Sequence, residues 1–145
     1  MTPEWSPLDT SNHQDHVIAH VLGTTVLGYF VADEAAHLLL DIGFVWTIYV
    51  DTEMGLLPQA VAINELPINA AMKAELLDDA TLLHDGGDAA SLKQMTQPPV
   101  DCLISEVACY AQDERRRVLL HGEEASLAVE TSLTDDEIRL TAVAS

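Results

Sequence analysis

One stretch, from Ile42 to Val50, constrains the fold more than any other. It reads Ile-Gly-Phe-Val-Trp-Thr-Ile-Tyr-Val, with β-branched and aromatic residues at both odd and even positions. A strand with water on one face alternates between polar and apolar side chains, whereas this run is apolar on both faces. We therefore predict a strand buried on both sides, followed by a turn over residues 51–55.

The clearest helix is predicted over about residues 67–85. Five apolar residues recur there at spacings of three and four, so they line one face of a helix. They are Ile68, Met72, Leu76, Ala80 and Leu83. Gly86 and Gly87 supply a stop signal for this helix. Asp88 can cap a short second helix that ends before Pro98.

The last third of the chain, about residues 100–143, is predicted to form an antiparallel meander. Four apolar segments alternate there with short polar turns. The pattern is clearest over residues 125–133, where Leu127 and Val129 alternate with small and polar residues. Such alternation indicates one face on the core and one face in water.

We expect a single α+β domain over residues 11–145, preceded by an irregular arm over residues 1–10. The arm contains two prolines and no periodicity, and its Trp5 is a candidate to fold back onto the domain. A chain of 145 residues suits one domain with its own core. Strands flank a central helical segment, which predicts a mostly antiparallel sheet packed with that helix.

Two alternatives stay open in the N-terminal part of the domain. Ser11 or Asn12 can cap a short N-terminal helix that ends at Gly23, and we favour this interpretation. Residues 17–32 also fit a β-hairpin. Residues 33–41 fit either a short helix or the second arm of a hairpin, because short apolar runs do not separate the two.

The charge of the chain limits its partners. There are 24 acidic and 6 basic residues, so the net charge is −18 with histidine neutral. A field of this sign repels phosphates, so we expect neither nucleic acid nor a membrane as a partner. It favours solubility and a basic protein partner instead.

Cys102 and Cys109 are the only cysteines of the chain. On one strand their odd separation places them on opposite faces, so they cannot form a disulfide with each other. The N-terminus has neither the basic start nor the apolar centre of a signal peptide. We therefore expect two free thiols in a cytoplasmic protein.

One group of residues has the spacing of metal ligands. His13, His16 and His20 stand at positions i, i+3 and i+7, which form one stripe on a helix. Neutral imidazoles on a rigid face suit zinc or another transition metal. On a strand His13 would face away from the other two, and the site would not form. No other cofactor is expected.

Two charged groups are further candidates. Asp78 and Asp79 lie late in the predicted helix, where the helix dipole disfavours acids, which makes them a candidate divalent-cation site. The run Arg115–Arg117 can hold an anion or a carboxylate of a partner. Alternatively, these arginines pair with acids such as Glu130 across a hairpin.

No catalytic motif is present in the sequence: it has no Gly-x-Ser-x-Gly, no phosphate-binding glycine loop and no dinucleotide fingerprint. Apolar residues make up 48% of the chain, and a surplus of this kind often forms an interface. Our leading hypothesis is a non-enzymatic protein-association module that binds a protein partner or itself as a homodimer. One alternative is an inhibitor or immunity-type protein that covers a basic partner. Another is a metal-binding protein or metal-dependent enzyme that uses His13, His16 and His20.

Overall fold

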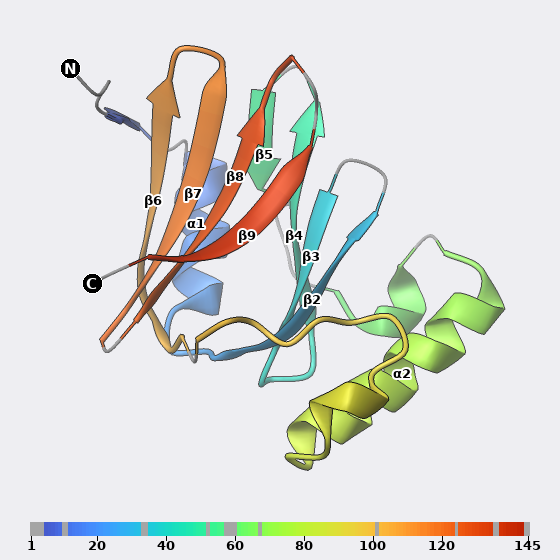
Figure 1. Cartoon of the computed structure of the whole chain (residues 1–145). Coiled ribbons are helices and arrows are strands. Elements are labelled where there is room, and N and C mark those ends of the chain that lie inside the picture. The colour runs from blue at the N-terminus through green and yellow to red at the C-terminus, as the bar shows by residue number, and fades with distance from the viewer. Residues whose placement is uncertain are drawn as a thin grey trace.

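In the computed structural model, the described part of the chain folds into two antiparallel sheets and two α-helices (Figure 1). This confirms the predicted α+β fold with a central helix and a C-terminal meander. The described residues are 5–9, 12–32, 35–51, 53–56, 61–66, 68–100, 102–123, 125–134 and 137–143.

The first sheet has five strands and contains the predicted meander. Its spatial order is β1 (Ser6–Leu8), β6 (Ile104–Gln112), β7 (Arg115–Gly122), β8 (Ser126–Ser132) and β9 (Ile138–Val143). Part of the arm that we predicted to be irregular is therefore a strand, because β1 pairs with β6 and places Leu8 opposite Cys109.

The second sheet has four strands in sequence order. They are β2 (Val26–Ala32), β3 (Ala35–Leu40), β4 (Val45–Asp51) and β5 (Glu53–Leu56). The strand predicted to be buried on both faces is β4, whose residues 45–48 are all buried. It begins later than predicted, because Gly43 has a φ of +88° in the turn that links β3 to β4. Ile42 and Phe44 of this turn are exposed.

The four-stranded sheet lies between two hydrophobic cores. Trp46 and Ile48 face the five-stranded sheet, and α1 (Asn12–Val21) contributes Val17 and Val21 to the same core. Trp46 is fully buried, and its indole nitrogen has no hydrogen-bond partner within the described part of the chain. Val45 belongs to a second core on the opposite face of the sheet. Figure 1 shows α2 (Ala70–His84) packed on that outer side, away from the meander.

The central helix forms for the reasons that its sequence indicates. Asn69 is the N-cap, and its Oδ1 accepts a hydrogen bond from the backbone N–H of Met72 at 2.8 Å. Gly86 follows the helix with a φ of +69°, a conformation that glycine adopts without strain. All five residues of the predicted apolar face pack in the second core, namely Ile68, Met72, Leu76, Ala80 and Leu83.

The structure decides both open alternatives. The N-terminal segment is the helix α1, and Gly23 follows it with a φ of +84°. The second ambiguous segment forms β3, which pairs with β2 and β4. Asp33 and Glu34, where that segment was predicted to begin, lie outside the described residues.

The prediction that the two cysteines lie on opposite faces is wrong. Cys102 is buried in the core between the sheets, and Cys109 packs against the same core. The reason is a register shift between Ile104 and Glu106, which inserts one residue into the alternation. Both thiols are free, and burial raises the pKa of each above its ordinary value.

Candidate functional site

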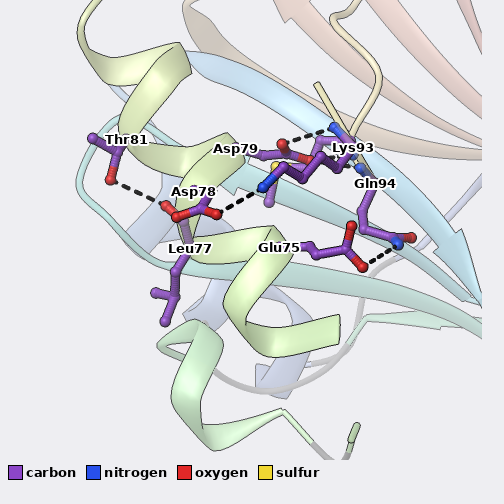
Figure 2. A network of polar contacts seen from close by, with 8 residues as sticks. Glu75, Leu77, Asp78, Asp79, Thr81, Lys93 and Gln94 are labelled. Atoms are coloured by element: carbon purple, nitrogen blue, oxygen red, sulfur yellow. Dashed lines mark hydrogen bonds and ion pairs between the residues drawn. The ribbon is translucent and has the colours of Figure 1, made fainter. Parts of the chain in front are cut away.

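The acidic pair in α2 holds a loop in place, as Figure 2 shows. Asp79 is only 1% exposed, and its carboxylate accepts three hydrogen bonds from backbone N–H groups. Its Oδ1 accepts from Lys93 at 2.9 Å, and its Oδ2 accepts from Gln94 at 2.7 Å and Met95 at 2.8 Å. Both carboxylate oxygens of this buried acid therefore accept hydrogen bonds from the backbone of a segment distant in the sequence.

Two side-chain contacts reinforce these three hydrogen bonds, and we call the whole set the acid clamp of α2. The Nζ of Lys93 binds the Oδ2 of Asp78 at 2.9 Å, and this hydrogen bond raises the pKa of Lys93. The side-chain amide of Gln94 donates to Glu75 at 3.3 Å (Figure 2). These contacts give the acids a structural role, since they fasten the loop after η2 (Ala89–Ser91) to the helix.

The histidine stripe lies on α1 as predicted for the helical alternative. The rings of His16 and His20 are both exposed, 4.8 Å apart between centroids and nearly perpendicular. The side chain of His13 lies outside the described residues, so the metal site stays a prediction. Among the side chains that the structure describes, no three His, Cys, Asp or Glu residues are grouped to hold a metal ion.

A hollow with apolar walls lies between α2, η1 (Ile63–Glu65) and the turn that links β3 to β4. We call it the α2 hollow, and its volume is roughly 330 Å³. Its apolar walls are Leu39, Ala62, Ile63, Leu77 and Ala80. His84 and Asp85 line its polar margin.

One large exposed apolar side chain lines the α2 hollow, and two more lie in the turn beside it. Leu77, which lines it, is 41% exposed, and this residue points away from the core that Leu76 fills. Gly43 also lines the hollow, and its chain neighbours Ile42 and Phe44 are 52% and 43% exposed. An apolar recess with an exposed leucine in its wall and a polar margin can hold an apolar group of a partner.

A second, polar surface lies on the outer face of the meander. The guanidinium of Arg117 donates from Nε and Nη2 to Oε1 of Glu130 at 2.9 Å and 2.6 Å. The ring of Trp5 covers this pair, with the Cζ of Arg117 4.3 Å and that of Arg115 5.2 Å from its centroid. Trp5, a candidate in the sequence, therefore folds back onto the domain. Arg117 pairs across the hairpin, which was one of the two alternatives for the arginine run.

A cavity of roughly 320 Å³ adjoins this surface, and we call it the meander cavity. Four charged residues and three hydroxyl-bearing residues line it, namely Arg115, Glu130, Glu137, Arg139, Thr131, Ser132 and Thr141. The sequence had indicated the arginine run to which Arg115 of this cavity belongs. The α2 hollow had no comparable signal, because its walls come from segments far apart in the chain.

Comparisons with protein-family models, with curated proteins and with solved structures find no match for this chain. No helix over the described residues is long and apolar enough to cross a membrane.

Proposed function

We propose that this protein is a non-enzymatic association module and that the α2 hollow is its docking site. The observation that carries the proposal is the exposure of Leu77 in a recess with apolar walls, beside the turn in which Ile42 and Phe44 are exposed. Burying these side chains against a partner would remove apolar surface from water, at roughly 25 cal/mol per Å². The volume of the recess, roughly 330 Å³, is at the lower end of the range for ligand-binding pockets.

The partner that this surface suits best is basic. Asp85 lines the hollow, and the exposed Glu65 follows Asn64 of its wall, whereas Lys73 donates to the backbone oxygen of Asn64 at 2.9 Å. The whole chain carries −18, which attracts a basic protein and repels a second copy of itself. This agrees with the inhibitor or immunity-type alternative and makes a homodimer the less favoured form of association.

We place this activity in the cytoplasm. The support comes from the two cysteines, which are both free thiols, because oxidising compartments favour disulfides.

The docking site can be tested with a synthetic amphipathic helix built from leucine and lysine. Its binding is measured by fluorescence polarisation, beside the same peptide with glutamate in place of lysine. We expect only the lysine peptide to bind. Its binding should weaken as salt is added, because salt screens the electrostatic attraction between the peptide and the acidic protein. Leu77→Glu should weaken binding at least tenfold, or about 1.4 kcal/mol.

Leu103→Glu is the matched control, because Leu103 is an exposed leucine that does not line the hollow. Equal losses in the two variants would reject the hollow as the docking site. Equal binding of the two peptides would reject the preference for a basic partner. Light scattering of the purified chain tests the other form of association, and a stable dimer would favour the homodimer.

A further inference from the structure

The basic residues of this acidic chain are concentrated in the meander. Of its six bases, four lie on β7 and β9, namely Arg115, Arg116, Arg117 and Arg139. Arg115 and Arg139 line the meander cavity, which is separate from the α2 hollow. The role of these arginines is therefore a question independent of the docking site.

One arginine has a structural task. Arg117 neutralises Glu130 through two hydrogen bonds to one carboxylate oxygen, and the ring of Trp5 covers its guanidinium. Both side chains of this pair are largely buried, so the pair is held in one geometry. Because the charge of Glu130 is already neutralised by Arg117, this acid cannot fully neutralise the charge of Arg115 as well.

Arg115 is the cation that this arrangement leaves facing the cavity. Its Nη1 donates to Oε1 of Gln112 at 3.3 Å in an exposed hydrogen bond, and its Nη2 is 3.8 Å from Oε1 of Glu130, beyond hydrogen-bonding distance. The side chain is 55% exposed, so a ligand can compete for it. On the other side, Arg139 binds Glu137 at 3.2 Å, with both side chains mostly exposed. Exposed ion pairs contribute little free energy, so a ligand can compete for Arg139.

We propose that the meander cavity binds a carboxylate group, with the guanidinium of Arg115 as its main contact. A planar guanidinium matches a carboxylate with two parallel hydrogen bonds, and the hydroxyls of Ser132 and Thr141 lie in the same cavity wall. The net charge of −18 opposes a dianion more than a monoanion, which favours carboxylate over phosphate. Both a free carboxylic acid and a glutamate side chain of a peptide carry this group.

The fluorescence of Trp5 reports on the proposed site, because its ring lies against Arg115 and Arg117. The protein is titrated with butyrate, which is a monoanion, with an end-blocked peptide containing one glutamate, with inorganic phosphate and with chloride, all at one ionic strength. We expect a saturable change with one or both carboxylates and none with chloride. Trp5→Phe should abolish this change, since Trp46 is buried in the core.

Arg115→Gln should weaken carboxylate binding at least tenfold, which corresponds to the loss of one charged hydrogen-bonding group. Arg116→Gln is the matched control, since it removes the same charge from the neighbouring position without changing the lining of the cavity. Saturation by butyrate alone assigns a small acid to the site, and saturation by the peptide assigns an acidic segment. Equal loss in both arginine variants, phosphate binding as tight as carboxylate binding, or no saturable change would overturn the proposal.

Discussion

Replacing Asp79 with alanine tests how strongly the acid clamp of α2 stabilises the fold. The substitution leaves three backbone N–H groups without the carboxylate that accepts from them, and that of Met95 is buried. A hydrogen bond to a charged group contributes about 1.5–3 kcal/mol, but the cost of burying the carboxylate disappears with it. We therefore expect the free energy of unfolding to fall by about 3–5 kcal/mol, less than the sum of three separate bonds.

Asp78→Ala is the matched control in the adjacent position of the same helix. Asp78 pairs with Lys93, but these side chains are 66% and 50% exposed, so water screens the interaction. Its loss should cost less than about 1 kcal/mol. Both variants gain the same helix propensity by changing aspartate to alanine, so this effect cancels in the comparison.

The two free energies are measured by urea unfolding, with intrinsic tryptophan fluorescence as the signal and linear extrapolation to water. The buried Trp46 makes this signal sensitive to loss of the core. A difference between the two variants below about 1 kcal/mol would refute the reasoning, because it would mean that the three N–H groups find water as readily as the carboxylate.

Two further predictions concern the histidines and the cysteines. Zn²⁺ should bind α1 and raise the melting temperature of the protein. His16→Ala or His20→Ala should abolish this rise, whereas the control His84→Ala should keep it. A calorimetric titration of the wild type with Zn²⁺ that gives no heat would reject this site. Burial raises the pKa of Cys102 and Cys109, so iodoacetamide at pH 8 should label the folded protein far more slowly than the protein in urea. Because the unfolded thiols ionise first, the free energy of unfolding should fall as the pH rises above their ordinary pKa of 9.0, and a rise in this range would contradict the burial of both groups.

Periodicity predicted those parts of the fold in which one residue pattern matches one environment. The apolar face of α2 follows the helical repeat, because every fourth residue meets the same sheet. In β8, Leu127 and Val129 pack in the core as predicted, but Ser126 and Ala128, which the alternation assigns to water, are also buried. The inclusion of Ile42 in the central strand was wrong, although the glycine that follows it was a visible turn signal.

Other features depend on contacts that local patterns do not contain. The register shift in β6 has no sequence marker, and it brings Cys102 and Cys109, predicted to lie on opposite faces, to the same core. Asp79 was recognisable as an unusual acid in its helix, but its partners begin at Lys93, well beyond the end of that helix. The walls of the α2 hollow likewise meet only after folding, because Leu39 and Leu77 come from different layers.

The middle position of the four-stranded sheet affects how this protein can be divided. Both of its faces are apolar, so a fragment lacking either α2 or the meander would expose one apolar face of the sheet to water. Such fragments should aggregate rather than fold, and expression of either half alone is an unsuitable route to studying one surface by itself. Point substitutions in the full-length chain are the appropriate means of separating its two surfaces.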